Sequence, residues 1–196
     1  AADQPGAGLD RPRRQVGIDR THLAVFELTQ AQWRLIAGEE PWLGQAEFAL
    51  GEDLPAAGLA LDAVEPVLAA FAAGRTWALR VPDGDTWEAA CRAGSGGLFA
   101  WGDSLEPALA GREALVWESA QGLRGAGPVG RRRANAAGYY DMHGNIAEWT
   151  REGVLRGGSW QDALINARAA QEAPADPARP HPLAGLRLEL VPAWPR

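Results

Sequence analysis

The stretch ANAAGYYDMHGNIAEWT, residues 134–150, decides most of what this sequence predicts, together with LRGGSW at 155–160. Gly144-Asn145 predicts a tight turn, because glycine and asparagine accept left-handed backbone geometry. Gly157-Gly158 predicts either a positive φ or a close approach of two backbone segments. The two stretches therefore indicate a scaffold of turns and short strands.

Large and charged side chains in the same stretches indicate how this scaffold is held together. Trp149 and Trp160 are expected to be apolar anchors, and their indole N–H groups need partners if they are buried. Glu148 and Arg156 are candidates for an internal ion pair. His143, which belongs to the Asp-Met-His-Gly-Asn turn, is expected to have a hydrogen-bonding role.

The first half of the chain carries signals of regular elements. Thr29-Gln30-Ala31-Gln32 is a capping-box pattern, which predicts a helix that stops at Gly38. Apolar residues at helical spacing predict a second helix over 62–73. Pro66 would then lie in the first turn of that helix or kink it.

Regular structure is expected to become sparse further along the chain. A short strand is predicted over 77–81, and a helix containing Trp87 would end at Gly94. Beyond that glycine, turn-forming residues recur every few positions. Only short strands are predicted there, at 154–156 and 186–190.

Length and composition fit one globular domain, with 196 residues, of which 46% are hydrophobic and 22% charged. We expect a loose segment over 1–14 and a single domain over 15–196. The net charge of −6 argues against nucleic-acid binding. No apolar run approaches the roughly 20 residues of a membrane helix, so we expect no membrane insertion. The sequence carries no signal from which the cellular compartment of the protein can be predicted.

Several motifs, in order and spacing, resemble those of the formylglycine-generating enzyme (sulfatase-modifying factor) superfamily. They are the two stretches above, GLRL at 185–188, FELTQAQW at 26–33, LRVP at 79–82, WEAA at 87–90 and WGD at 101–103. The resemblance implies an α+β domain of C-type lectin-like fold, with two or three short helices, short antiparallel strands and much irregular loop.

The resemblance also implies what is missing. The superfamily's oxidase activity depends on two nearby thiols that bind copper, and they lie between the Arg-Gly-Gly-Ser motif and the closing strand. Here that interval, 161–184, contains no cysteine. The single thiol, Cys91, is interpreted as a buried small hydrophobe. We therefore do not expect an enzyme of this kind.

The same interval is interpreted as a ligand-binding segment on a rigid scaffold, because two scaffold motifs flank a stretch without clear helical or strand periodicity. The variable proteins of diversity-generating retroelements resemble this superfamily and carry their hypervariable segment there. By that analogy, a protein or other macromolecular ligand would contact Gln161, Asp162, Leu164, Ile165, Gln171, Ala173, Pro174, His181, Pro182 and Leu183.

Calcium is the one cofactor that the resemblance suggests, since proteins of this superfamily and fold often carry it. Its oxygen ligands would come from Asp141, Asn145 and Glu148. Two alternatives to a binding domain stay open. One is an oxygen- or metal-dependent enzyme that uses residues other than cysteine, and the other is a structural surface or assembly domain.

Overall fold

The computed structural model describes residues 22–43, 48–116 and 125–193. Its elements in chain order are β1 (His22–Leu23), α1 (Gln30–Ala37), α2 (Leu61–Ala72), β2 (Trp77–Arg80), α3 (Gly84–Arg92), α4 (Pro107–Glu113), β3 (Ala147–Trp149), β4 (Val154–Arg156), the 3-10 helix η1 (Leu164–Ala167), β5 (Ala173–Pro174), β6 (Ala184–Gly185) and β7 (Glu189–Pro192).

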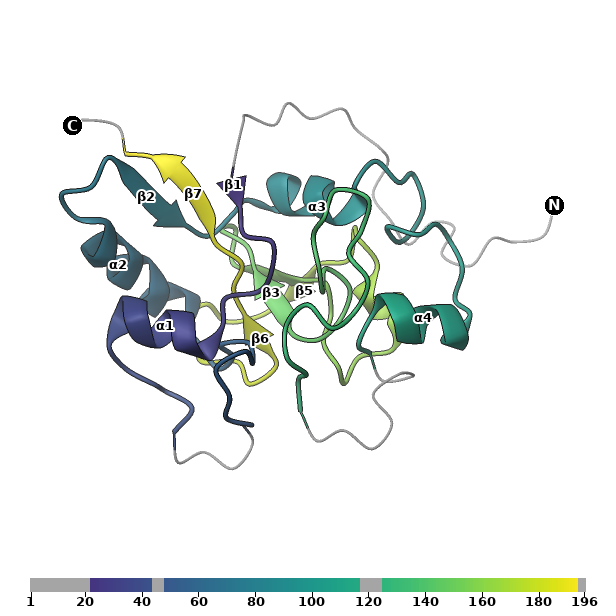
Figure 1. Cartoon of the computed structure of the whole chain (residues 1–196), viewed down its shortest axis with the longest axis horizontal. Helices are drawn as coiled ribbons and strands as arrows, with labels where there is room; N and C mark the ends of the chain where they lie inside the picture. Colours follow the sequence, from purple (N-terminus) through teal and green to yellow (C-terminus); the bar gives the residue numbers. More distant parts are fainter. Residues whose placement is uncertain (1–21, 44–47, 117–124, 194–196) are drawn as a thin grey trace.

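The strands form two small sheets, ordered β1-β7-β2 and β5-β4-β3-β6. Figure 1 shows α1 and α2 beside the first sheet, α3 near the second sheet, and α4 at the opposite end of the molecule from α2. All pairs are antiparallel except β3 with β6, which is parallel. That pair joins residues far apart in sequence, so local patterns did not reveal it. None of the described helices is long and apolar enough to cross a membrane.

The first helix follows its capping signal. The Thr29 hydroxyl accepts a bond from the Gln32 N–H at 3.2 Å, and the Thr29 N–H donates to the Gln32 side chain at 3.0 Å. Gly38 ends α1 with a φ of 72°. In α2, Pro66 lies inside the helix on its exposed side, beyond the predicted first turn.

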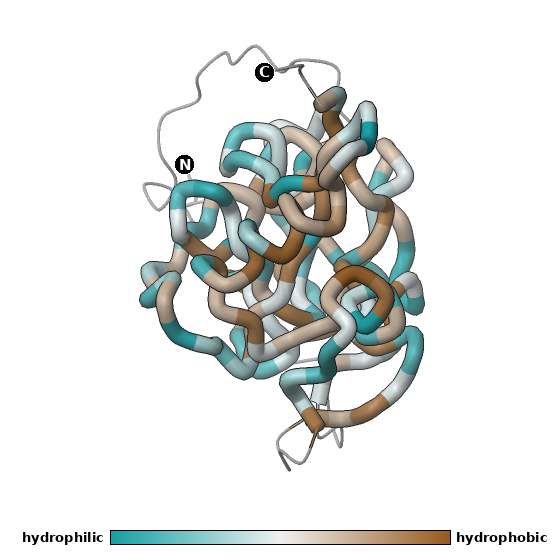
Figure 2. Tube along the Cα trace, turned by 90° about the vertical axis from the view of Figure 1, so that its left-hand side faces the viewer, coloured by the Kyte–Doolittle hydropathy of each residue, from teal (hydrophilic) through white to brown (hydrophobic). Residues whose placement is uncertain are grey.

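Two parts of the chain form elements that differ from the sequence predictions. The helix α4 was not predicted, because it is only seven residues long and contains Gly111. The strand expected over 186–190 is divided into β6 and β7, since Leu186, Arg187 and Leu188 lie between them outside either sheet. Figure 2 shows hydrophobic and hydrophilic residues alternating in short runs along the chain, as expected of a fold with short elements.

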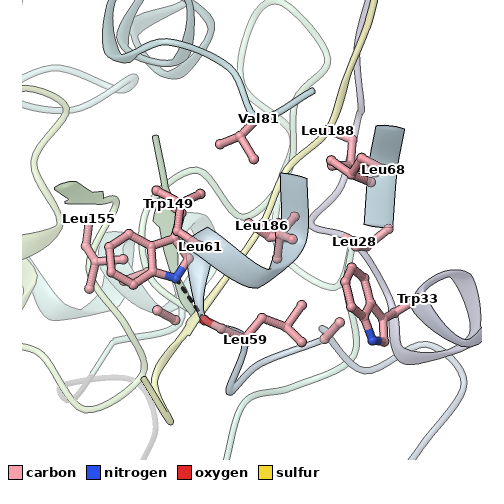
Figure 3. Packing of buried hydrophobic residues seen from close by; sticks show 14 of the residues in the cluster. Leu28, Trp33, Leu59, Leu61, Leu68, Val81, Trp149, Leu155, Leu186 and Leu188 are labelled. Atoms are coloured by element: carbon pink, nitrogen blue, oxygen red, sulfur yellow. Dashed lines mark hydrogen bonds between the residues drawn. The ribbon is translucent and has the colours of Figure 1, made fainter. Parts of the chain in front are cut away.

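The main core lies between the two helices α1 and α2 and both sheets, and Figure 3 shows its packing. Trp149 is fully buried, and its indole N–H donates to the Leu59 carbonyl at 3.1 Å. Trp149 is therefore the anchor that the sequence predicted. Trp160 is only half-buried, so it does not share that role.

The left-handed backbone predicted at Gly144-Asn145 and the positive φ predicted at Gly157-Gly158 are confirmed. Gly144 and Asn145 have φ angles of 93° and 60°, and Gly157 and Gly158 have φ angles of 85° and 66°. A Cβ atom on Gly144 would lie 2.2 Å from the Leu115 carbonyl oxygen, so glycine is required there for space as well as for conformation.

The internal ion pair differs from the prediction. Glu148 binds Arg187, whose Nη2 lies 2.7 Å from Glu148 Oε1 and whose Nε lies 3.0 Å from Oε2. Arg156 instead pairs with Glu88 at 3.1 Å and Glu172 at 2.6 Å. Although Glu148 and Arg156 stand opposite each other in the β3–β4 register, their side chains bind residues from distant segments.

Replacing Arg187 with methionine is expected to lower the free energy of unfolding by about 3–5 kcal/mol, because Glu148 would stay buried without its counter-charge. Urea unfolding followed by tryptophan fluorescence measures the loss. As a control, Arg179→Met removes only an exposed pair with Asp176 and should change stability by less than about 1 kcal/mol. Equal losses for the two variants would contradict the role assigned to Arg187.

Candidate ligand-binding site

The segment 161–184 runs from one edge of the second sheet to the other. It starts after Trp160, whose N–H binds the Asn145 carbonyl at 2.9 Å, and passes through η1. It then forms β5 at one edge and returns to β6 at the opposite edge. These edges are separated by about 14 Å, three strand spacings of about 4.8 Å. The predicted contact residues are therefore not gathered at one edge of this sheet.

Three of the predicted residues meet at a pocket of about 210 Å³: Gln161, Pro182 and Leu183. Trp160 and Ile146 line the same pocket. Its remaining walls come from elsewhere in the chain, namely Gln30, Phe48, Ala49, Leu54, Pro55, Ala57, Gly125 and Ala126. Both ends of the predicted segment thus converge on one hollow.

The wall formed by residues 48–57 was not predicted from the sequence, and Gln30 fixes it in place. The Gln30 side chain is buried; it donates to the Ala49 carbonyl at 2.9 Å and accepts from the Gly51 N–H at 3.1 Å. The start of helix α1 therefore positions this wall through the Gln30 carboxamide together with backbone bonds, among them that from the Gln30 N–H to the Leu54 carbonyl at 2.8 Å. The sequence signal was indirect, since Gln30 was noted only as part of the capping pattern.

Three other predicted residues lie at the β5 edge. Ala173 and Pro174 pair with Leu155 and Val154 of β4, and Ala173 also packs against the main core. The Gln171 side chain donates to the neighbouring Glu172 carbonyl at 2.8 Å. These residues take part in the scaffold and lie away from the pocket.

The remaining predicted residues have mostly internal partners. Leu164 is only 3% exposed and packs with Phe99 in a small second core, against which Ile165 also lies. Asp162 accepts bonds from the Ser159 N–H at 2.8 Å and hydroxyl at 2.7 Å. His181 is half-buried and accepts the Leu183 N–H at 3.3 Å, which shapes the turn before β6. Leu164 in particular does not face solvent.

The three residues proposed for calcium already bind protein donors. Asp141 accepts the Gly130 N–H at 2.5 Å, and Asn145 accepts the Gly127 N–H at 2.8 Å. Glu148 is engaged by Arg187 and by the Trp87 indole. Within the described part of the chain, no group of three or more His, Cys, Asp or Glu side chains could hold a metal ion. Calcium binding stays a prediction, and this geometry does not favour it.

Electrostatics in this region reflect burial. Desolvation raises the pKa of Asp141 above its ordinary value. Desolvation, reinforced by the nearby carboxylates of Asp141 and Glu148, raises the pKa of Glu27 well above its ordinary value. Glu27 receives the Asn145 amide at 2.8 Å and the Ile146 N–H at 3.2 Å. The carboxyl groups of this cluster thus hold backbone and turns together.

The single thiol lies beside His143 in the interior. His143 Nδ1 is 2.7 Å from the Ala167 carbonyl, and Nε2 is 3.1 Å from the Ala100 N–H and 3.5 Å from Cys91 Sγ. This arrangement fits a neutral ring protonated at Nδ1. Cys91 is fully buried, and desolvation raises the pKa of its thiol. Its interpretation as a buried small hydrophobe, and the hydrogen-bonding role of His143, are confirmed.

A family model described as the sulfatase-modifying factor enzyme 1-like domain matches residues 3–190. The chain belongs to this family. It is 40% identical over 78 residues to a formylglycine-generating enzyme of Mycobacterium tuberculosis, covering 36% of this chain and 26% of that protein. It is 31% identical over 102 residues to the inactive C-alpha-formylglycine-generating enzyme 2 of Bos taurus, covering 42% and 33%. The matches thus span a third or less of these curated relatives.

Solved structures confirm the C-type lectin-like α+β fold that the motifs implied. Pseudomonas aeruginosa PvdO superposes with a TM-score of 0.72 at 20% identity, covering 87% of this chain and 80% of that one. Treponema denticola variable protein 1 superposes with a TM-score of 0.69 at 20% identity, covering 83% and 81%. The family includes members described as inactive, and this chain has one cysteine, so it lacks a pair of catalytic thiols.

The environment of His143 predicts a pH dependence of stability. Desolvation lowers the pKa of His143 to about 4, against 6.5 in an exposed histidine. Between pH 6.5 and pH 4, the imidazole therefore binds a proton in the unfolded chain but not in the folded chain. The contribution of His143 to the free energy of unfolding should fall by up to about 3 kcal/mol as the pH drops from 7 to 4.

Glu27 and Asp141, with raised pKa values, act in the opposite direction, so the measurement needs a matched variant. Urea unfolding of the native protein and of His143→Asn, compared at several pH values, isolates the histidine. The stability advantage of the native protein should shrink as the pH falls. An advantage that stays constant from pH 7 to 4.5 would contradict the assigned protonation state.

Proposed function

We propose that this chain is a non-catalytic ligand-binding domain whose ligand-facing surface surrounds the pocket at Trp160. The observation that carries the proposal is the convergence of Gln161, Pro182 and Leu183 on this pocket. These residues lie on loops at both ends of an irregular segment. Loops that a rigid scaffold positions are where proteins commonly place their ligand-binding residues. The missing thiol pair supports the non-catalytic part of the proposal.

The finer proposal is that this surface is diversified, as in the variable proteins of diversity-generating retroelements, and that it binds a protein or other macromolecule. The similarity in fold to Treponema denticola variable protein 1 supports this. Differences in exposure support this proposal, because a substitution at an exposed position leaves the core intact whereas one at a buried position disturbs it. Gln161 and Pro182 are exposed, whereas Leu164 and Ala167 are buried.

Deep sequencing of the gene in a growing population of its source tests the finer proposal. We expect substitutions to concentrate at codons 161, 182 and 183. The codons of buried Leu164 and Ala167 serve as internal controls and should stay fixed, as should 141–150. An invariant interval, or variation spread evenly over buried and exposed codons, would overturn diversification.

The non-catalytic part is tested separately by oxygen consumption. The full chain, supplied with copper and a cysteine-containing peptide, is expected to consume no more oxygen than copper and peptide alone. Sustained turnover above that background, abolished by heat-unfolding the protein, would overturn the proposal in favour of an enzyme that uses residues other than paired cysteines.

A further inference from the structure

We propose that the pocket at Trp160 is an anchor site that takes one aromatic side chain of a protein partner. This inference rests on the proposed function and names the chemistry of the ligand. It depends on three properties of the described residues: the size of the pocket, the character of its lining and the exposed apolar surface next to it.

The size of the pocket suits a single ring. Its volume is about 210 Å³. An apolar cavity of roughly 150 Å³ is enough to hold benzene, whereas sites for drug-sized molecules usually need about 300–1,000 Å³. The pocket is therefore large enough for one aromatic side chain and too small to enclose most of a larger free ligand.

The lining of the pocket is uncharged among the described residues. Ile146, Phe48, Leu54 and Leu183 provide apolar walls, and Trp160 adds an aromatic surface. Such a pocket offers no charge for a phosphate or carboxylate, so it favours an apolar insert.

Polar groups in the lining are few, and one of them is occupied. Gln30 lines the pocket, but its carboxamide is already bound to the Ala49 carbonyl and the Gly51 N–H. Among the described residues of the lining, Gln161 supplies a second carboxamide, and the Trp160 indole N–H is the remaining side-chain donor. The side chains of the described lining therefore offer few hydrogen-bonding groups to a polar ligand such as a sugar.

Exposed apolar surface also lies next to the pocket. Leu50 and Leu43 are 60% and 55% exposed, and both line a second hollow that shares Gln30 with the pocket. Arg34 borders this hollow and pairs with Glu40 at 3.1 Å and with Glu52 at 3.6 Å.

This pattern matches a protein interface. An apolar centre beside a charged rim is its usual anatomy, and buried aromatic side chains dominate its affinity. A partner whose ring enters the pocket would also cover Leu50. We therefore assign the occupant to a folded protein or peptide that presents an aromatic residue, and the charged rim to its flanking contacts.

The test uses N-acetyl-tryptophan amide as the probe, with N-acetyl-lysine amide and methyl glucoside as comparisons. Methyl-resolved NMR of the full chain reports binding through Ile146 and Leu183. The tryptophan amide is expected to shift these methyl signals and to bind at least about tenfold more tightly than either comparison, because only an aromatic ring gains from apolar burial there.

Two matched variants locate the binding. Ala49→Trp places a ring at the exposed mouth of the pocket, and Ala178→Trp places one on an exposed turn outside it. Ala49→Trp should weaken binding of the tryptophan amide at least about tenfold, and Ala178→Trp should leave it unchanged. Thermal unfolding of both variants checks that each is folded, and Leu183→Ala replaces Ala49→Trp as the pocket variant should that one not fold.

The outcomes separate this inference from the proposed function. Equal or tighter binding of the lysine amide or the glucoside would overturn the aromatic anchor, as would binding that Ala49→Trp leaves unchanged. Neither result would alter the sequencing outcome, on which diversification depends. Conversely, an invariant gene whose product still binds the tryptophan amide at the pocket would support the anchor and remove only the diversified version of the function.

Discussion

The buried pair of Arg187 and Glu148 is the interaction on which the rest of the fold depends. Besides both oxygens of Glu148, the guanidinium donates to the carbonyls of Ala24 and Tyr140 at 3.0 Å and 2.9 Å. Glu148 also accepts the Trp87 indole N–H at 2.7 Å. Five segments of the chain, among them α3 and β3, thus meet at one charge pair. The cost of burying two charges is offset only because nearly every donor and acceptor is satisfied.

Local signals predicted the parts of the fold that depend on neighbouring residues. The capping pair at Thr29 and the turn at Gly144 form as expected because their partners lie within a few positions. The partner of Glu148 was predicted wrongly, since Arg187 approaches from a segment 39 positions away. The family motifs supplied the overall architecture, but they carried no information about the parallel pairing of β3 with β6.

In the candidate site, too, local features were predicted and long-range contacts were not. The sequence located the ends of the irregular segment, and Gln161 and Leu183 do face one pocket. The sequence did not show that this segment runs from one edge of the second sheet to the other. Along that path Ala173 becomes part of β5, and the Leu164 side chain packs into the second core. The opposite wall depends on Gln30, whose side chain bonds to residues about twenty positions away. Such contacts are tertiary, and a helix-capping pattern gives no hint of them.

The position of β7 has a consequence for how the protein is made. This strand lies between β1 and β2, yet it follows all the other described strands in the chain. During synthesis, the first sheet therefore cannot assemble until residues 189–192 have left the ribosome. The ion pair of Glu148 with Arg187 cannot form until nearly the same stage. The apolar faces of α1 and α2 emerge much earlier and stay without their partners. The first sheet is consequently completed late, and until then the apolar surface of these helices is open to aggregation.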